Sequence, residues 1–425
     1  MTIHVVRPGD TVAALAAEYG VDAGRLAADN AVGPAGELAV GQTLVIRFPG
    51  QSHTVRPGET LTDIAGRYGV TVRQLWRRNW PLGGGSDLRP GQTLVVSYRE
   101  ETPLGSAIFN GYAYPFIGRA LLASQLPYLT DMAPFTYGIS ASGGLLPLED
   151  EALIAAARLR GTAPVMHLST LTEGGSFDTG RAERVLTDTA LQDRLSEQVL
   201  STLEEKGYAG LDVDFEYLPG TLAGAYAAFL TRMGALLRGG GRFLWAALAP
   251  KTSAAQPGLL YEGHDYAAVS AAVDAVLLMT YEWGYTAGPP MAVAPVPNVR
   301  SVLDYAVTEM PPEKILQGIP NYGYDWPLPF VQGVTRAQSI SNQQAIQIAI
   351  ERGVAIQYDE TAQAPFFRYA DEDGRSHEVW FEDARSMDAK LRLIAEYGFQ
   401  GGGIWNLMRP FSQTWLVLDS LYELL

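Results

Sequence analysis

The sequence contains no cysteine, and this absence excludes several kinds of site at once. Without a thiol, the chain has no disulfide, no thiolate metal ligand and no cysteine nucleophile. Positive charge is also scarce, because 31 Lys and Arg residues stand against 46 Asp and Glu residues, for a formal net charge of −15. Such a field repels phosphate and no long basic run offsets it, so the composition argues against nucleic acid as a partner.

Long apolar runs and metal-ligand spacings are missing too. No stretch of about 18 apolar residues occurs without a charge or a breaker, so we expect no membrane span. The chain starts MTIHVVRPGDTVAALA, which has neither a basic n-region nor an apolar h-region, so we expect no secretory signal peptide. We also expect no metal and no cofactor, because the histidines lack metal-ligand spacing. These histidines are His4, His53, His167, His264 and His377.

What the sequence does contain, first, is an internal repeat with a period near fifty residues. Residues 4–11 read HVVRPGDT, and residues 53–60 read HTVRPGET. Further on, GQTLV occurs at residues 41–45 and again at 91–95. In each copy a β-branched segment ends at Pro-Gly, two stretches with helical apolar spacing follow, and a short strand closes the unit. The repeat therefore predicts two small βααβ modules.

Both copies, at residues 1–49 and 50–99, resemble LysM modules. This resemblance implies binding to N-acetylglucosamine-containing glycans such as peptidoglycan and chitin. The alternative is an exposed repeat that only spaces or dimerises the chain. The residues expected to contact sugar are those of the Pro-Gly turns: Gly9, Asp10, Thr11, Gly58, Glu59 and Thr60.

From about residue 103 onward, short apolar runs alternate with helical stretches. This pattern predicts an α/β fold, a (β/α)8 TIM barrel over residues 100–425, with its site at the C-terminal ends of the strands. Extra chain at roughly residues 325–386 is expected to form a small α+β insertion and one wall of the cleft. The candidate strands are Ala107–Tyr112, Phe135–Ser140, Pro164–Ser169, Gly210–Phe215, Phe243–Leu248, Ala275–Tyr281, Ile315–Pro320 and Gly402–Trp405.

The fourth of these strands carries three alternating carboxylates. In GLDVDFEY, residues 210–217, Asp212, Asp214 and Glu216 share one face of the strand, because side chains alternate across it. The apolar face must cover the helices, so the carboxylates point into the barrel. Burying like charges together costs several kcal/mol unless protons are shared. Close carboxylates also push their pKa values apart, which leaves one group protonated near neutral pH to act as an acid.

This segment resembles the DxDxE motif of family 18 glycoside hydrolases. The resemblance implies that Glu216 is the general acid/base, that Asp214 orients the 2-acetamido group of the substrate, and that Asp212 shares a proton with Asp214. The family's longer pattern usually has another Asp before the glycine, where this chain has Ala209. The catalytic trio itself is intact.

Other strand ends carry further candidate residues. The MTYE segment at residues 279–282 resembles the family's Met-x-Tyr-acid motif, in which the tyrosine, here Tyr281, hydrogen-bonds the acetamido oxygen. Trp405 resembles the tryptophan beneath the cleaved sugar, where an aromatic face covers pyranose C–H groups. His167 is interpreted as a hydrogen-bonded interior residue. The other expected substrate-binding residues are Met279, Glu282, Tyr112, Asp325 and Trp326.

The family resemblance implies retaining hydrolysis assisted by the N-acetyl group of the substrate. The whole architecture is similar to the bacterial spore cortical-fragment-lytic N-acetylglucosaminidases, which implies action on peptidoglycan cortex fragments during germination. It also implies a place in the spore coat and cortex region, after synthesis in the mother-cell cytoplasm without a signal peptide. Two alternatives remain: a chitinase acting on chitin or chitooligosaccharides, and a noncatalytic glycan-binding coat protein with an inactive barrel.

Overall fold

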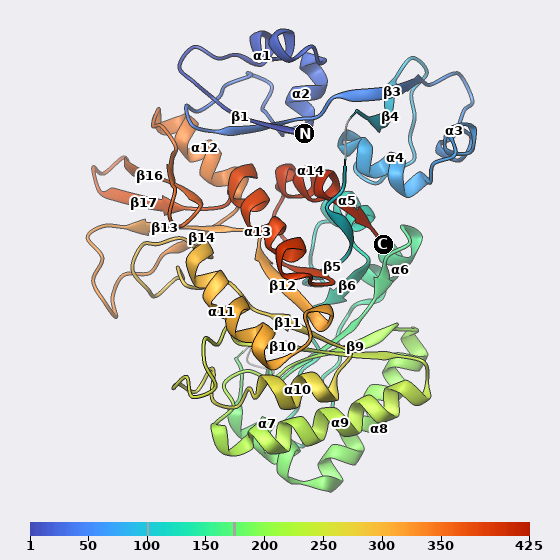
Figure 1. The fold of residues 1–425 in the computed structure, drawn as a ribbon, viewed down its shortest axis with the longest axis vertical. Helices are drawn as coiled ribbons and strands as arrows, with labels where there is room; N and C mark the ends of the chain where they lie inside the picture. The colour runs from blue at the N-terminus through green and yellow to red at the C-terminus, as the bar shows by residue number, and fades with distance from the viewer. Residues whose placement is uncertain (100–101, 173–175) are drawn as a thin grey trace.

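The computed structural model describes residues 1–99, 102–172 and 176–425. The expected boundary between the second module and the barrel adjoins residues 100–101, which lie outside the described residues. Figure 1 shows two small modules at one end of the longest axis and a large barrel below them, with a smaller sheet-containing part beside the barrel.

The first module consists of β1 (Thr2–Val5), α1 (Val12–Tyr19), α2 (Ala23–Asp29) and β2 (Thr43–Ile46). β1 and β2 pair in antiparallel fashion, with Ile3 opposite Val45. The turn before α1 requires a glycine, because Gly9 has a φ of 90°. Thr11 then caps α1, and its hydroxyl accepts a hydrogen bond from the amide of Ala14.

The second module repeats this order with β3 (Pro49–Thr54), α3 (Leu61–Tyr68), α4 (Val72–Arg78), the short 3₁₀ helix η1 (Trp80–Leu82) and β4 (Thr93–Tyr98). Here Thr60 and Asp63 form a reciprocal capping box at the start of α3. The repeated sequence therefore produces a repeated structure, down to the residue that begins the first helix.

The barrel strands form a parallel sheet in the order β7-β6-β5-β18-β12-β11-β10-β9-β8. β7 pairs with β6 and β8 pairs with β9, and the two are parts of one strand interrupted at Val165. As far as the structure describes the chain, the ring therefore closes with eight strands. These strands are β5 (Gly105–Ala113), β6 (Asp131–Pro134), β7 (Ala163–Pro164) with β8 (Met166–Ser169), β9 (Gly210–Asp214), β10 (Phe243–Leu248), β11 (Ala275–Leu278), β12 (Ile315–Pro320) and β18 (Gly401–Trp405).

Helices surround this ring (Figure 1). The α-helices are α5 (Arg119–Gln125), α6 (Glu151–Leu159), α7 (Thr179–Thr187), α8 (Thr189–Lys206), α9 (Ala223–Gly239), α10 (Tyr266–Ala272), α11 (Val296–Glu309), α13 (Ala384–Tyr397) and α14 (Ser412–Leu421). The shorter elements are η2 (Leu126–Tyr128), η3 (Gly220–Leu222), η4 (Pro312–Lys314) and the terminal strand β19 (Tyr422–Leu424), which pairs with β5. The TIM-barrel fold class predicted from the sequence is confirmed.

The position predicted for the second strand is wrong. The sequence favours Phe135–Ser140, whereas the strand in the barrel is β6, Asp131–Pro134. A charged residue and a proline at its two ends make β6 unlike a strand in composition. The more apolar segment that follows continues past the barrel rim and joins the neighbouring strand through an isolated bridge between Tyr137 and Leu168.

The insertion contains β13 (Gly323–Pro327), β14 (Gln338–Ile340), α12 (Asn342–Arg352), β15 (Gln357–Asp359), β16 (Ala364–Ala370) and β17 (Ser376–Trp380). Its strands form an antiparallel sheet in the order β14-β13-β17-β16-β15. α12 covers one face of the sheet, where Phe367 and Val379 pack in a separate small core with Ile346 and Ala349. Tyr324 lies on the opposite face of the sheet.

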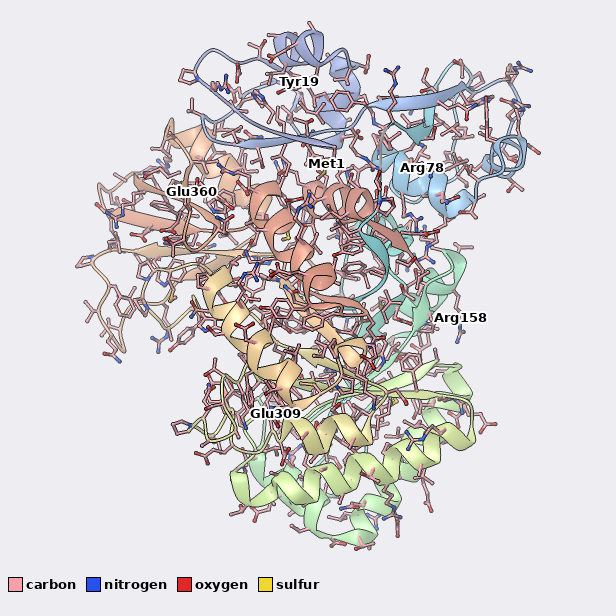
Figure 2. All side chains as sticks on the ribbon, viewed as in Figure 1. Met1, Tyr19, Arg78, Arg158, Glu309 and Glu360 are labelled. Carbon is pink, nitrogen blue, oxygen red and sulfur yellow. The ribbon has the colours of Figure 1, made fainter. Side chains whose placement is uncertain are left out.

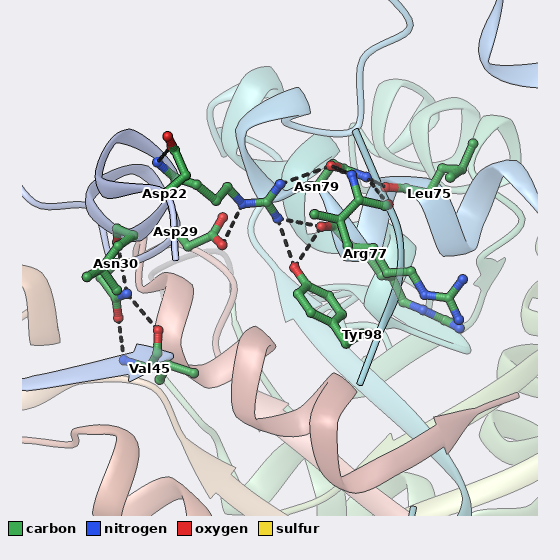
Figure 3. Close-up of polar contacts among 12 residues, drawn as sticks. Asp22, Asp29, Asn30, Val45, Leu75, Arg77, Asn79 and Tyr98 are labelled. Atoms are coloured by element: carbon green, nitrogen blue, oxygen red, sulfur yellow. Dashed lines mark hydrogen bonds and ion pairs between the residues drawn. The ribbon is translucent and has the colours of Figure 1, made fainter. Parts of the chain in front are cut away.

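Polar contacts hold the two modules to each other. Arg25 of α2 pairs with Asp29 at 2.6 Å, and its guanidinium also donates to Asn79 at 3.0 Å and to the hydroxyl of Tyr98 at 2.9 Å. Figure 3 shows Asp29 on the first module facing Asn79 and Tyr98 on the second, with these contacts between them. The modules are thus joined by side chains as well as by the short link between β2 and β3.

Both modules are also bound to the barrel through α14. The buried amide of Gln413 accepts from the hydroxyl of Thr43 at 2.7 Å and donates to the carbonyl of Thr43 at 2.6 Å. Asp419 pairs with Arg47 at 2.9 Å and with Arg77 at 3.0 Å, and all three side chains are nearly inaccessible to solvent. Met1, labelled in Figure 2, lies between the first module and the barrel and packs against the barrel core. The modules are therefore fixed to the barrel.

No helix in the described ranges is long and apolar enough to cross a membrane.

Replacing Asp419 with Asn tests the energetic importance of this contact between modules and barrel. The substitution preserves volume but removes the negative charge of Asp419 that the buried guanidinium groups of Arg47 and Arg77 both contact. Loss of one partner from a buried ion pair costs about 3 kcal/mol or more, so we expect the free energy of unfolding to fall by about that amount in chemical denaturation. Asp373→Asn, on an exposed turn, is the control and should change it by less than about 0.5 kcal/mol. An equally small change for Asp419→Asn would contradict a stabilising role for the pair.

Candidate active site

A cavity of about 460 Å³ lies among the C-terminal ends of the barrel strands. Several strands contribute to its lining: Asp214 ends β9, Trp405 ends β18, and Tyr281 follows β11. This is the end of the barrel where TIM-barrel sites are found, because the loops there converge on one opening. The lining residues are Tyr112, Phe135, His167, Asp214, Glu216, Tyr217, Ala247, Pro250, Leu260, Tyr261, Leu277, Met279, Tyr281, Glu282, Trp283, Tyr285 and Trp405.

The apolar side chains of β9 and its continuation face the helices. Leu211, Val213 and Phe215 are fully buried in the main core. The ring of Phe215 stacks on Tyr226 and Phe229 of α9, with 5.7 Å between ring centroids in both cases. Because side chains alternate along the strand, this packing turns the intervening carboxylates toward the barrel interior.

These carboxylates lie at different depths. Asp212 is fully buried and accepts a hydrogen bond of 2.7 Å from the hydroxyl of Tyr112. Asp214 lines the cavity and is almost fully buried, whereas Glu216 is partly exposed at the cavity wall. One carboxylate oxygen of Asp212 and one of Asp214 are buried without a hydrogen-bond partner among the described residues. Each of these oxygens is thus open to a proton or, at Asp214, to a substrate donor.

The structure also brings His167 to this cluster. Its Nε2 atom lies 3.6 Å from Asp214 and 4.0 Å from Asp212, and its Nδ1 atom lies 2.6 Å from the hydroxyl of Thr136. Burial lowers the pKa of His167 to about 3, so the ring is neutral at physiological pH. His167 is buried and hydrogen-bonded, as its interpretation from the sequence stated, and it is in addition part of the cavity wall.

The surroundings raise the pKa of every carboxyl group in the cluster. Burial raises the pKa of Glu216 to about 7, and the nearby carboxylate of Glu282 acts in the same direction. Burial raises the pKa of Asp212 to about 6, opposed by the hydrogen bond from Tyr112. For Asp214, burial raises the pKa well above its usual value, and the charges of Glu216 and Asp212 add to this effect. A cluster of this kind retains protons at neutral pH and can supply one to a bound molecule.

Glu282 is held in place by two tyrosines. The hydroxyl of Tyr322 donates to its carboxylate, and the hydroxyl of Tyr324 donates to the same oxygen at 2.9 Å. Burial raises the pKa of Glu282, and both hydrogen bonds oppose this shift by stabilising the charged form. The sequence offered no signal for this contact, because each tyrosine lies about forty residues from Glu282 and one of them belongs to the insertion.

Two of the expected substrate-binding residues lie elsewhere. Trp326 is fully buried, and its indole N–H donates to the carbonyl of Gly288 at 2.8 Å. Asp325 points to the other face of the insertion sheet and accepts hydrogen bonds from Tyr369 at 2.6 Å and His377 at 2.8 Å. The structure brings neither residue to the cavity, and none of the described residues of the insertion lines it, so the prediction that this segment forms one wall of the cleft is wrong. Their neighbour Tyr324 contacts the site only through its hydrogen bond to Glu282.

Aromatic side chains form the rest of the cavity. Trp405 packs against Phe135, with ring centroids 4.9 Å apart, and against Tyr112 at 5.7 Å. Tyr281 and Met279 lie on the wall contributed by β11. The aromatic residues that sequence reasoning missed are Phe135, Tyr217, Tyr261, Trp283 and Tyr285. Most of them lie in loops beyond the ends of the strands, where the sequence has no helical or strand periodicity that would show which side chains face the cavity.

The turns expected to contact sugar in the modules have clear local roles. Asp10 accepts from the amide of Arg7 at 2.7 Å and lies 3.0 Å from the ring of His4, and these contacts lower its pKa. In the second module, Glu59 accepts from the amide of Arg56 at 2.8 Å and lies 2.7 Å from the ring of His53.

These contacts of Glu59 lower its pKa to about 2. Gly58 adopts a positive φ of 81°, as Gly9 does, and Thr60 caps the N-terminus of α3. The glycines and threonines of both turns are exposed, and Asp10 and Glu59 between them are half-buried.

Comparisons with known proteins agree on the two parts of the chain. Residues 166–409 match the family model of Glycosyl hydrolases family 18, and residues 4–47 and 53–97 match the LysM domain. The cortical fragment-lytic enzyme of Bacillus subtilis (strain 168) is 40% identical over 429 residues, which cover 100% of this chain and 98% of that protein.

Solved structures extend the similarity to the whole chain. The crystal structure of the Bacillus cereus spore cortex-lytic enzyme SleL superposes with a TM-score of 0.84 at 36% identity, over 100% of this chain and 98% of that one. The Bacillus megaterium QM B1551 spore cortex-lytic enzyme SleL gives a TM-score of 0.83 at 35% identity over the same shares. The chain belongs to glycosyl hydrolase family 18, as a glycoside hydrolase that carries two LysM domains.

Proposed function

We propose that this glycoside hydrolase cleaves N-acetylglucosaminyl β-1,4 bonds in the peptidoglycan of spore cortex fragments, by retaining, substrate-assisted catalysis. The observation that supports this most is the series of carboxylates along β9 and its continuation, of which Asp214 and Glu216 line the cavity together with Tyr281. Similarity to cortical fragment-lytic enzymes along the full chain supports the choice of substrate.

In the first step, Glu216 is the general acid. Its raised pKa, about 7, keeps a substantial fraction of the carboxyl group protonated near neutral pH. Glu216 gives this proton to the glycosidic oxygen while the carbonyl oxygen of the substrate's N-acetyl group attacks the anomeric carbon. The bond to the leaving sugar breaks, and a cyclic oxazolinium intermediate forms on the substrate itself.

The residues around the acetamido group stabilise this intermediate. Asp214 has a free carboxylate oxygen to accept from the acetamido N–H, and the hydroxyl of Tyr281 donates to the acetamido oxygen. Asp212, held by Tyr112, shares a proton with Asp214 and so limits the cost of placing two carboxylates together. Positioning the internal nucleophile in this way replaces an external one and lowers the entropy cost of the step.

In the second step, Glu216 has become a carboxylate and acts as a base. It accepts a proton from a water molecule whose oxygen attacks the anomeric carbon, which opens the oxazolinium ring and regenerates the N-acetyl group. Two displacements at the same carbon retain its configuration. Trp405 covers the apolar face of the sugar throughout, because an aromatic ring packs well against pyranose C–H groups.

The two modules anchor the enzyme to the same glycan. Their exposed turns lie on the molecule's surface, while their opposite sides are fixed to the barrel through Gln413 and Asp419. This arrangement suits an enzyme that acts at the spore coat and cortex on an insoluble or partly degraded glycan. Binding by the modules then raises the local substrate concentration at the cavity.

A chitooligosaccharide hydrolase is the second candidate. The residues of the cavity assigned above recognise an N-acetyl group, which chitin carries on every sugar. The barrel is also similar to a chitinase from Chromobacterium violaceum ATCC 12472, at 26% identity and a TM-score of 0.69 over 74% of this chain. Only the choice of glycan differs between the candidates, and the residue roles are the same.

Glu216→Gln should abolish turnover while preserving the shape of the cavity. Removal of a general acid lowers a rate by about 10²–10⁴-fold, so we expect a loss of about 10³-fold in kcat. The measurement is mass spectrometry of the products from cortex fragments and from chitin oligomers, incubated separately. Glu197→Gln, an exposed position on α8, is the matched control and should retain full activity. Cleavage of chitin alone would favour the second candidate, and undiminished activity of Glu216→Gln would refute the assigned acid.

The pH dependence of kcat/KM should report the charge of Glu282. The wild-type rate should fall above about pH 7, where Glu216 loses its proton. The carboxylate of Glu282 opposes that ionisation, so Glu282→Gln should lower the pKa of Glu216 and move the alkaline limb toward lower pH. Tyr322→Phe should move it in the same direction by less, because loss of the hydroxyl raises the pKa of Glu282 and reduces its negative charge. An unchanged alkaline limb in Glu282→Gln would contradict this coupling.

A further inference from the structure

Arg409 is a half-buried arginine near the cavity with no carboxylate partner among the residues that the structure describes. Its guanidinium donates a hydrogen bond of 3.0 Å to the hydroxyl of Ser339. Burial lowers the pKa of Arg409, so its surroundings do not fully replace water around the charge. By contrast, Arg368 on β16 of the insertion sheet is paired with Glu378 at 2.7 Å. An unpaired guanidinium is unexpected in a chain with a net charge of −15.

The backbone of Arg409 is firmly held. Arg409 lies in the loop after β18, four residues beyond Trp405. The fully buried side chain of Asn321 donates to the carbonyl oxygens of Asn406 and Arg409, at 3.2 and 3.1 Å. A side chain on a backbone fixed in this way loses less freedom when it binds a ligand, which favours a role in recognition.

A short series of contacts connects Arg409 to the cavity. Ser339, the exposed partner of Arg409, lies directly opposite Tyr324 across the strands β14 and β13. Tyr324 in turn donates its hydroxyl to Glu282 in the cavity wall. Arg409 therefore lies on the insertion side of the site, with the side chains of Ser339 and Tyr324 between it and Glu282 in the cavity wall.

We propose that Arg409 binds a carboxylate carried by a muramic acid residue of the substrate, and that this contact makes the enzyme prefer peptidoglycan to chitin. The inference rests on the proposed function, because it assumes a glycan bound in this cavity. N-acetylmuramic acid differs from N-acetylglucosamine by a lactyl ether that ends in a carboxyl group, either free or extended by a peptide with its own carboxylates. Chitin has no such charge. A guanidinium binds a carboxylate through charge-assisted hydrogen bonds, and the half-buried setting of Arg409 strengthens them.

The test compares the wild type with Arg409→Gln on three substrates: cortex fragments, the same fragments with their carboxyl groups converted to amides, and chitin oligomers. A charge-assisted contact is worth about tenfold, so we expect Arg409→Gln to lower kcat/KM on untreated fragments by about that factor. On amidated fragments and on chitin oligomers the change should stay below about twofold. Arg336 is an exposed arginine in the loop before β14, and Arg336→Gln is the matched control, which should behave as wild type on all three substrates.

Fragments stripped of peptide by an amidase distinguish the two sources of the carboxylate. A preserved tenfold effect on stripped fragments assigns the contact to the lactyl carboxylate, and its loss assigns the contact to the peptide. An equal decrease on all three original substrates would overturn the proposal, since it would show that Arg409 only positions Tyr324 and Glu282. No decrease on any of them would also overturn it. Failure of the wild type to cut cortex fragments would instead refute the proposed function itself.

Discussion

Asp212, Asp214 and Glu216 are carried at one end of a buried strand, and their mutual repulsion constrains the rest of the site. Burial raises the pKa of each group, and nearby carboxylates raise it further at Asp214 and Glu216, so the cluster must hold protons or receive polar support. Tyr112 provides that support to Asp212, and the neutral ring of His167 lies beside Asp214 without adding a charge. The same repulsion that makes the cluster costly leaves Glu216 able to give up a proton near neutral pH. The three carboxylates therefore determine both which polar groups must surround them and which proton the site can supply.

A second constraint concerns the position of the modules. A glycan-binding module on a flexible linker would bring the enzyme to its substrate without orienting it. Here Gln413 and Asp419 on the last helix make buried polar contacts with both modules, so modules and barrel share one orientation. Buried charges are stable only when paired, which makes this contact specific to one geometry. A chain of sugars bound by the modules therefore meets the cavity from a fixed direction.

Much of this architecture could be predicted from the sequence, because the patterns are local. The Pro-Gly turns repeat with their helix-capping threonines, Thr11 and Thr60, and the barrel strands are apolar runs separated by helices. The second strand was misplaced because β6 begins with Asp131 and ends with a proline, so an apolar segment just outside the barrel resembled a strand more closely.

The contacts that could not be predicted are those between distant parts of the chain. Tyr322 reaches Glu282 from the chain just after β12, and Tyr324 reaches it from the first strand of the insertion. Side chains alternate along β13, so Tyr324 lies on the face toward Glu282 and Asp325 lies on the other face, beside His377. The sequence alone does not show which of the two alternating sets of side chains points toward the barrel. Gln413 and Asp419 are polar residues on a helix, and polarity alone would place them in solvent.

In the proposed function, the barrel and the insertion have different tasks: the barrel binds the reacting sugar, and the insertion side of the site distinguishes one glycan from another. In the proposed reaction, the interior of the barrel binds a feature common to chitin and peptidoglycan, the N-acetyl group, because that group acts as the internal nucleophile. A feature that distinguishes the two glycans must be read where the neighbouring sugar lies, outside the ring of strands. None of the described residues of the insertion lines the cavity, but Tyr324 on its first strand donates a hydrogen bond to Glu282 in the cavity wall. In this proposal, changes in the insertion can alter which sugar substituent is recognised, while the carboxylates along β9 stay the same.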